Sequence, residues 1–537
     1  MAARSAPPER RTLPAVSPMH DSAPSSRALV LGRTFSLRDV HDVAFRRANV
    51  TLDPEIRAQL QASRAQLLAD VNAGQVIYGV NTGFGALSNT TVPADKLEDL
   101  QRNLLRSHAC GVGPLLPAEV VRTLLALRAH TLALGASGAS PEVVEGILEL
   151  LAHDVLPAVP AQGSVGASGD LAPLAHLALP LIGEGHVLTD NGGRRPAAEA
   201  LADAGITPVP LGPKEGLCLI NGTQVTTAIG ALATWTAGNV IASADVIGAL
   251  SLDAGLNTTA AFDPRIHAGK PHPGQIETAA TIRALVDGSP LHDSHADCGE
   301  VQDAYCFRCM PQVHGAVRAA VRYVAQSLSI ELDSFTDNPL LLRRDDGGYD
   351  VVSGGNFHAG SVAVPIDHLT AAITTLATIS ERRTDRFMSP STSRGLPAFL
   401  ADDPGVESGF MLAHVTAAAL ASECKTLSFP ASVDTIPTSA GKEDHVSMGP
   451  GAARKLSKAV DNVSAVLAVE AMAAARVLDL RSHSTSPRLS AVHGKIREHV
   501  PPHEGDRVLA DDIERLAMAI RAGQLLEAAE VDSPLST

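Results

Sequence analysis

The segment AARKLSKAVDNVSAVLAVEAMAAARVLDL, residues 452–480, is long, rich in alanine and helical in its pattern. Its apolar positions recur every three or four residues, which is typical of a helix with a buried face. The same periodicity occurs in four earlier segments: 115–135, 315–332, 361–388 and 408–425. Strand-like alternation is scarce and short, at Val76–Val80 and Val351–Ser353. We therefore predict an all-α protein whose long helices form a bundle.

Loops rich in glycine and proline separate these helices and hold unusual clusters of polar residues: 78–89, 160–173, 263–275 and 430–451. Such loops on a rigid helical frame commonly carry function. We expect residues 1–28, rich in Ala, Pro, Ser and Arg, to form a disordered tail. An N-terminal part with the catalytic loops is expected over 29–230, and a helical C-terminal part over 231–537. No linker marks this boundary, so the two parts are expected to be intertwined.

The composition excludes several classes of partner. The 537 residues carry a formal net charge of -15, which disfavours nucleic acid and anionic membranes. No apolar run reaches the roughly 18 residues of a membrane span without a charge or a break, and the N-terminal segment lacks the hydrophobic core of a secretion signal. Six cysteines give no disulfide framework. We expect a cytoplasmic protein, and its mean hydropathy of +0.10 suggests surface hidden between subunits.

The segment GSVGASGDLAPLAH, residues 163–176, is the most informative loop. Its spaced glycines superficially resemble a phosphate-binding loop. However, no Gly-Lys-Ser/Thr ending follows, no basic residue is nearby, and Pro157 and Pro160 interrupt any strand leading into it. A plain structural turn is the other simple interpretation.

The tripeptide Ala167-Ser168-Gly169 within this segment resembles the signature of the histidine, phenylalanine and tyrosine ammonia-lyase family. In that family the tripeptide cyclises and loses water to give a 4-methylidene-imidazole-5-one group. The residue types suit this chemistry, because Gly169 has no side chain to hinder attack of its nitrogen on the Ala167 carbonyl. The Ser168 side chain would become the exocyclic methylene. The resemblance extends from about residue 30 to 520 through further motifs: YGVNTGFG (78–85), SHACGVG (107–113), EGLCLINGTQ (215–224), FDPRIHAGKPHPGQ (262–275), VQDAYCFRC (301–309), TDNPL (336–340), SGGNFH (353–358) and EDHVSMG (443–449).

The resemblance implies a long-helix bundle with a loop-rich N-terminal part carrying the active site. It also implies a homotetramer in which subunits share each site, and no metal or nucleotide. Tyr78 would be the base that removes the β-proton, although a phenol's ordinary pKa of about 10 must then be lowered. Arg308 would bind the substrate carboxylate with its forked guanidinium. Asn221 would hold the carboxylate or the amino group, and three further residues would line the pocket: Gln302, Tyr305 and Phe357.

A zinc site is an alternative interpretation of residues 292–309. His292, His295, Cys298, Cys306 and Cys309 are all of preferred ligand types. Their spacing lacks a second clean pair, and the last two cysteines flank Arg308 within a motif that the lyase resemblance already explains. We therefore expect no metal.

Two positions bear on the substrate. Ser107-His108 matches the histidine-type pair of the family, and Glu423 in ALASECK matches a carboxylate that faces the imidazole in histidine-specific members. A carboxylate and a histidine give both imidazole nitrogens a partner. We expect a small-molecule amino acid substrate, L-histidine, with elimination of ammonia to trans-urocanate.

Other residues depart from the histidine-type pattern and keep alternatives open. Lys442 and His414 each stand where a glutamine is common, and Gly360-Ser361 replace a usual Glu-Pro. The alternatives are a tyrosine or phenylalanine ammonia-lyase, or an aminomutase that makes a β-amino acid. A catalytically inactive helical relative that serves as a scaffold is a further alternative.

Overall fold

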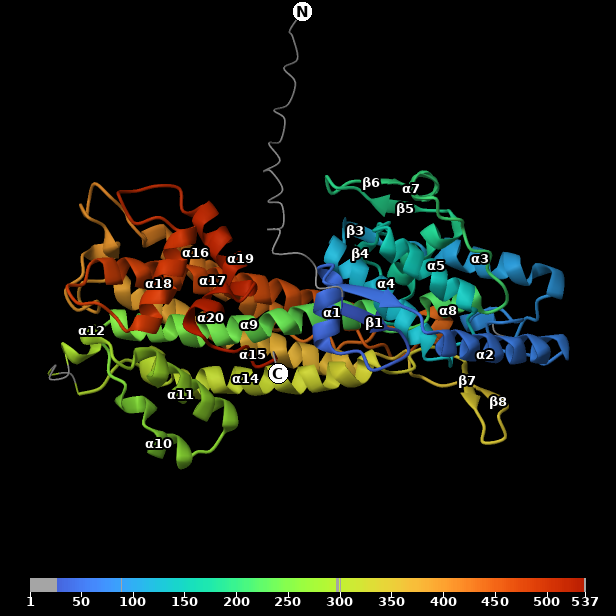
Figure 1. Ribbon diagram of the computed structural model, residues 1–537, viewed down its shortest axis with the longest axis horizontal. Coiled ribbons are helices and arrows are strands. Elements are labelled where there is room, and N and C mark those ends of the chain that lie inside the picture. Colours follow the sequence, from blue (N-terminus) through green and yellow to red (C-terminus); the bar gives the residue numbers. More distant parts are fainter. Residues whose placement is uncertain (1–26, 88, 296–298, 300, 536–537) are drawn as a thin grey trace, which may run out of the picture.

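Four long helices pack side by side along the length of the molecule and form its core (Figure 1). The structure, a computed structural model, describes residues 27–87, 89–295, 299 and 301–535. The four core helices are α9 (Gln224–Ala254), α14 (Met310–Leu332), α15 (Gly360–Met388) and α17 (Gly449–Asp479). The described chain is mostly helical, which confirms the predicted fold class.

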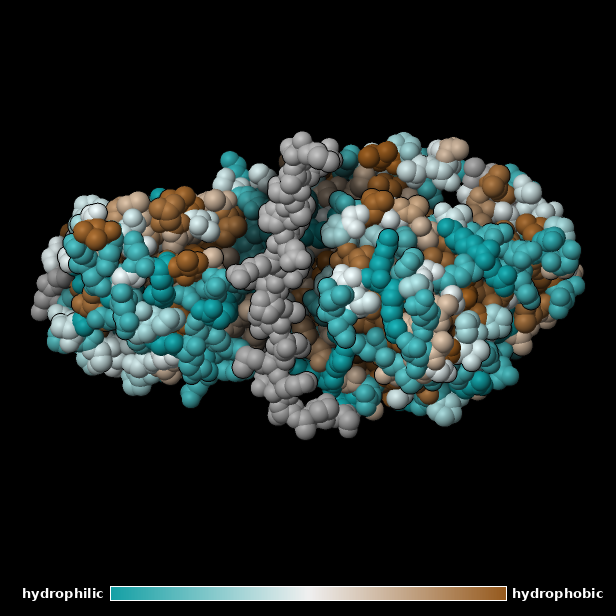
Figure 2. Space-filling view, turned by 90° about the horizontal axis from the view of Figure 1, so that it is seen from above, coloured by the Kyte–Doolittle hydropathy of each residue, from teal (hydrophilic) through white to brown (hydrophobic). Residues whose placement is uncertain are grey.

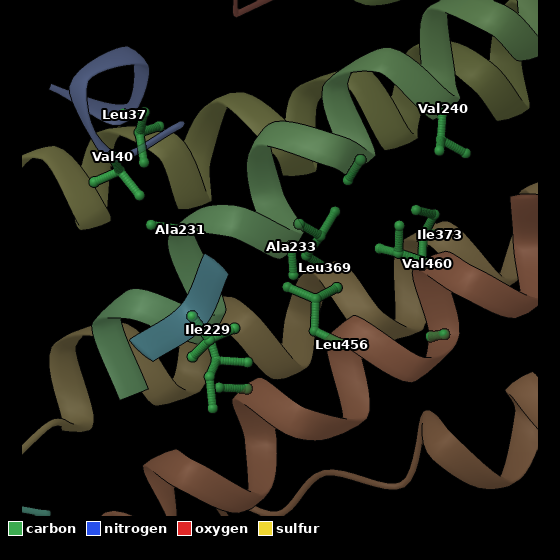
Figure 3. Packing of buried hydrophobic residues seen from close by; sticks show 14 of the residues in the cluster. Leu37, Val40, Ile229, Ala231, Ala233, Val240, Leu369, Ile373, Leu456 and Val460 are labelled. Atoms are coloured by element: carbon green, nitrogen blue, oxygen red, sulfur yellow. The ribbon is translucent and has the colours of Figure 1, made fainter. Parts of the chain in front are cut away.

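Apolar residues on nearly every side explain why α9 lies at the centre of the bundle. It packs against α14, α15 and α17. Figure 3 shows Ile229 and Val240 of α9 near Leu369 and Ile373 of α15, with α17 beside them. By length and composition α9 and α15 could cross a membrane, but 78% and 67% of their most apolar windows are buried inside the protein. They are core helices, and their burial accounts for the high mean hydropathy.

Shorter helices surround this core. They are α1 (Leu37–Ala44), α2 (Pro54–Asn72), α3 (Leu97–His108), α4 (Ala118–Ala133), α5 (Pro141–Ala152), α6 (Leu171–Ala178), α7 (Ala197–Ala204), α8 (Glu215–Ile220), α10 (Pro264–Ala268), α11 (Pro273–Val286), α12 (Pro290–Asp293), α13 (Tyr305–Arg308), α16 (Met411–Leu427), α18 (Pro487–His499), α19 (Ala510–Arg521) and α20 (Gln524–Ala529). Single 3₁₀ turns are η1 (Gly85–Leu87), η2 (Ala94–Lys96), η3 (Leu179–Ile182), η4 (Ala260–Phe262), η5 (Ala398–Leu400) and η6 (Ser439–Gly441). The five helices predicted from periodicity are confirmed as α4, α14, α15, α16 and α17, with ends shifted by a few residues.

The described strands form four separate two-stranded sheets. The pairs are β1 (Arg27–Val30) with β2 (Ala48–Thr51), which is parallel, and three antiparallel pairs: β3 (Val112–Leu115) with β4 (Pro160–Gln162), β5 (His186–Leu188) with β6 (Arg194–Pro196), and β7 (Leu340–Arg343) with β8 (Tyr349–Val352). The strand predicted at 351–353 is confirmed as the end of β8. The strand predicted at Val76–Val80 is wrong, because Gly79 has φ +67° and the Asn81 side chain accepts a hydrogen bond from the Ile77 N–H, which closes a turn.

The predicted domain division is only partly covered by the described residues. The tail was predicted over residues 1–28. Residues 1–26 lie outside the described residues, and Arg27 and Ala28 belong to β1. Helix α9 continues through residue 230 without a break. The division there into two parts stays a prediction.

Candidate active site

The loop that carries the tripeptide opens into a cavity of about 840 Å³. Its walls come from loops distant in sequence and from the ends of α3 and α8, at the end of the molecule opposite α12 (Figure 1). The polar and aromatic lining residues include Tyr78, Phe84, Asn103, Ser107, His108, Ser168, Asn221, Asn338, Phe357, His358, Lys442, Glu443, Asp444 and His445. The cavity therefore gathers motifs that lie more than 300 residues apart in the chain.

The tripeptide forms a strained turn that neighbouring groups hold on both sides. Ser168 has φ +51° and Gly169 has φ +84°, so both lie in the left-handed region. A Cβ on Gly169 would lie 2.4 Å from the Gly222 carbonyl oxygen, so only glycine fits there. The Asn221 side-chain N–H donates to the Ser168 carbonyl at 2.6 Å, and the Ser168 hydroxyl donates to Glu443 Oε1 at 2.7 Å. The backbone is thus bent and its carbonyl polarised before any reaction.

Asp170 ties this turn to the start of the central helix. Its backbone N–H donates to the Gly222 carbonyl at 2.8 Å. Its carboxylate accepts hydrogen bonds from the Thr226 N–H at 2.8 Å and the Thr226 hydroxyl at 3.2 Å. Burial raises the pKa of Asp170 to about 7, although the hydrogen bonds from Thr226 act in the opposite direction.

Tyr78 and His108 face the same cavity from different elements. The Tyr78 hydroxyl oxygen accepts a hydrogen bond from the Gly85 N–H at 3.2 Å. His108 Nδ1 lies 2.9 Å from the Leu104 carbonyl oxygen, which can only accept, so this contact assigns the proton to Nδ1 and leaves Nε2 as an acceptor. Burial lowers the pKa of His108, which keeps the ring neutral near pH 7.

Four of the residues predicted for the site do not line this cavity. Gln302 is exposed, and Tyr305 is 70% exposed. The Arg308 guanidinium lies 4.5 Å from the centre of the Tyr305 ring. Glu423 lies on the exposed side of α16. Within one chain, the structure thus brings together Tyr78, His108, the tripeptide, Asn221 and Phe357, and leaves these four apart.

The described histidines and cysteines of the alternative zinc site do not form a group that could hold a metal ion. Cys298 lies outside the described residues, and His295 Nδ1 is 3.0 Å from the Leu291 carbonyl oxygen. Over the described part of the chain, one group of side chains is spaced closely enough to hold a metal ion: Asp402, Glu407 and His503, none of which lines the cavity. The expectation of no metal stays a prediction.

Glu443 is a site residue that the sequence analysis did not assign. Besides its contact with Ser168, its Oε2 accepts a hydrogen bond from the Thr438 hydroxyl at 2.8 Å. The signal was present in the motif EDHVSMG, which Glu443 opens. That motif matched the family, but only the fold shows that its first carboxylate points at the tripeptide.

Known proteins resemble the chain over nearly its whole length. A family model described as aromatic amino acid lyase matches residues 35–498. A histidine ammonia-lyase of Sorangium cellulosum is 49% identical, covering 94% of this chain and 99% of the relative. The crystal structure of histidine ammonia-lyase from Trypanosoma cruzi has a TM-score of 0.86 at 41% identity, covering 95% of this chain and 96% of that one. The crystal structure of a tyrosine aminomutase from Streptomyces globisporus has a TM-score of 0.87 at 38% identity, covering 94% of this chain and 98% of that one. The chain belongs to the aromatic amino acid lyase family.

Proposed function

We propose that this chain eliminates ammonia from L-histidine and releases trans-urocanate. One observation carries the proposal: the Glu443 carboxylate and the His108 ring lie in the same cavity as the Ala167-Ser168-Gly169 turn. Both groups accept hydrogen bonds and so suit an imidazole N–H. The curated histidine ammonia-lyases that are 47% to 49% identical over nearly the whole chain support the same substrate.

We infer that the tripeptide cyclises to 4-methylidene-imidazole-5-one. The Gly169 nitrogen bonds to the Ala167 carbonyl carbon, whose oxygen leaves as one water, and Ser168 loses its hydroxyl and α-hydrogen as a second. The residues present fit this group, because the turn is already bent at Ser168 and Gly169 and Asn221 donates to the carbonyl that the ring retains. The group supplies an electrophilic methylene that draws electrons from the substrate amine.

The remaining residues bind the substrate and move its proton. Tyr78 lines the cavity, and its phenol oxygen acts as general base toward the β-proton. The Gly85 N–H donates a hydrogen bond to this oxygen and orients it. Asn221, whose side chain donates to the Ser168 carbonyl and lines the cavity, contributes to binding the amino acid end. Phe357 provides an apolar wall that excludes water beside these groups.

Glu443 takes the role at the imidazole that the sequence pattern assigned to Glu423. Before cyclisation its Oε1 accepts the Ser168 hydroxyl, and loss of that hydroxyl frees the oxygen for the substrate. Thr438 keeps the other oxygen in place through its own hydrogen bond. His108 presents the unprotonated Nε2 as a second acceptor.

The assembled enzyme is proposed to be a cytoplasmic homotetramer in which another subunit completes each cavity. Gln302, Tyr305 and Arg308 do not line the cavity of their own chain, and helix α13, which holds Tyr305 and Arg308, contacts α14 and α15. Hydrophobic patches lie between hydrophilic residues on the face in Figure 2. Exposed apolar side chains such as Val301, Phe429 and Val433 are suited to burial between subunits.

A substrate panel tests the proposed reaction. The protein is incubated separately with L-histidine, L-tyrosine and L-phenylalanine, and the products are identified by NMR. We expect urocanate and ammonia from histidine and far slower conversion of the other two. Coumarate, cinnamate or a β-amino acid as the main product would instead support the tyrosine, phenylalanine or aminomutase alternatives.

A further inference from the structure

Lys442 is the one lysine or arginine among the described residues that line the cavity. Its side chain is exposed and its ammonium makes no hydrogen bond or ion pair with any other described residue, whereas the Glu443 and Asp170 carboxylates beside the tripeptide both accept hydrogen bonds. An unpaired cation in a substrate cavity is free to bind a substrate atom. The reaction proposed above assigns no role to Lys442.

The loop around Lys442 fixes it next to Glu443. The Thr438 N–H donates to the Glu443 carbonyl at 2.9 Å, which closes a tight loop over residues 438–443. Three successive residues of this loop, Ser439, Ala440 and Gly441, have positive φ. Lys442 itself is helical, with φ -76° and ψ -28°, so its side chain and that of Glu443 are not forced to opposite faces as in a strand. Both side chains line the same cavity.

The hydrogen-bonding groups of a neutral imidazole explain what such a pair could recognise. The ring carries one N–H donor and one unprotonated nitrogen that accepts. Glu443 and the Nε2 atom of His108 are both acceptors, so they can serve only the N–H. The Lys442 ammonium carries three donors and no acceptor. It supplies the donor that the unprotonated ring nitrogen needs.

We propose that Lys442 is a specificity-determining residue that donates a hydrogen bond to the unprotonated ring nitrogen of the substrate while Glu443 accepts from the other nitrogen. This inference rests on the proposed function, because it takes histidine as the substrate. A phenylalanine side chain offers no acceptor and would leave the ammonium unpaired. Lys442 therefore favours a heteroaromatic ring over a benzene ring of similar size.

The test compares Lys442→Met, Lys442→Gln and the control Lys96→Met, an exposed lysine outside the cavity. For each variant, KM and kcat for histidine are measured, together with the binding of trans-urocanate and trans-cinnamate by calorimetry. Both ligands carry a carboxylate, but only urocanate has a ring nitrogen. We expect Lys442→Met to raise KM roughly 10-fold to 100-fold, with a smaller change in kcat. Urocanate binding should weaken to a similar extent and cinnamate binding should not.

Glutamine should restore part of the affinity, because its amide N–H also donates. The control variant should behave as the unmodified protein does. Equal weakening of urocanate and cinnamate would overturn the proposal, since Lys442 would then bind the shared carboxylate. An unchanged KM and unchanged urocanate binding in Lys442→Met would overturn it as well. Failure of the proposed function can be told apart from failure of the Lys442 proposal, because in the first case the unmodified protein produces no urocanate from histidine.

Discussion

At the scale of single residues, the site depends on which carboxylate reaches the substrate ring. Glu443 lies 2.7 Å from the Ser168 hydroxyl, whereas Glu423 is exposed on α16. We predict that Glu443→Gln lowers kcat/KM for histidine by about 100-fold or more, because the amide loses the negative charge that balances a polarised imidazole. Glu423→Gln is the matched control and should change kcat/KM little. Steady-state kinetics that show full activity in Glu443→Gln would contradict this assignment.

Glu443 and the tripeptide show which parts of the site could be predicted from the sequence and which could not. The tripeptide, Tyr78 and Asn221 line one cavity, and each lies in a distinctive Gly-rich or polar motif that singles it out in the sequence. Glu443 lies in an equally distinctive motif, but its direction depends on the loop that precedes it. That loop bends through three consecutive residues with positive φ, two of which are not glycine. No local sequence pattern predicts such a path.

At the scale of elements, Asp170 joins α6 to α9, and its protonation should be visible in stability. Its pKa is raised from 3.8 to about 7 by burial. At low pH the folded and unfolded chains both hold the proton, whereas between about pH 4 and 7 only the folded chain retains it. The buried carboxyl therefore stabilises the fold fully at low pH, and this contribution is lost as pH rises through 7. The loss amounts to at most about 4 kcal/mol.

Asp170→Asn removes this titration and keeps hydrogen-bonding atoms for Thr226. We predict that the variant gains stability relative to the unmodified protein as pH rises from 4 to 7, with no further gain above pH 8. Urea unfolding midpoints of the two proteins, measured at intervals across this range, give the difference. A difference that is constant with pH would show that Asp170 titrates normally.

The helices themselves were predictable to within a few residues, because their apolar periodicity follows from burial against neighbours. The error at Val76–Val80 has a related cause. Ile77 and Val80 are buried, but they pack from a turn and not from a strand. A short apolar alternation does not distinguish these two ways of burying side chains.

At the scale of the whole molecule, the residues predicted for one site lie in two groups. One group surrounds the tripeptide, whereas the other, with Arg308, does not line that cavity. Sequence order alone could not reveal this separation, because it does not show how far apart two motifs lie in the folded chain. Subunit mixing tests whether the second group completes the cavity of a neighbouring subunit.

We predict that Ser168→Ala and Arg308→Ala are each nearly inactive alone but regain activity when co-expressed as mixed tetramers. If Arg308 completes a neighbour's cavity, random assembly restores about one site in four. The control mixture is Ser168→Ala with Tyr78→Phe, which lie in the same chain's cavity and should give much less recovery. No recovery in the Ser168 and Arg308 mixture would contradict a shared site.

Ala167, Ser168 and Gly169 are proposed to form the electrophile, and intact-mass spectrometry of the purified protein tests this cyclisation. We expect a chain lighter by two water molecules than its sequence requires. The Ser168→Ala variant should show no such loss of two waters, because it lacks the hydroxyl whose departure turns the Cβ into the exocyclic methylene. An unshifted mass in the unmodified, active protein would show that the tripeptide does not cyclise.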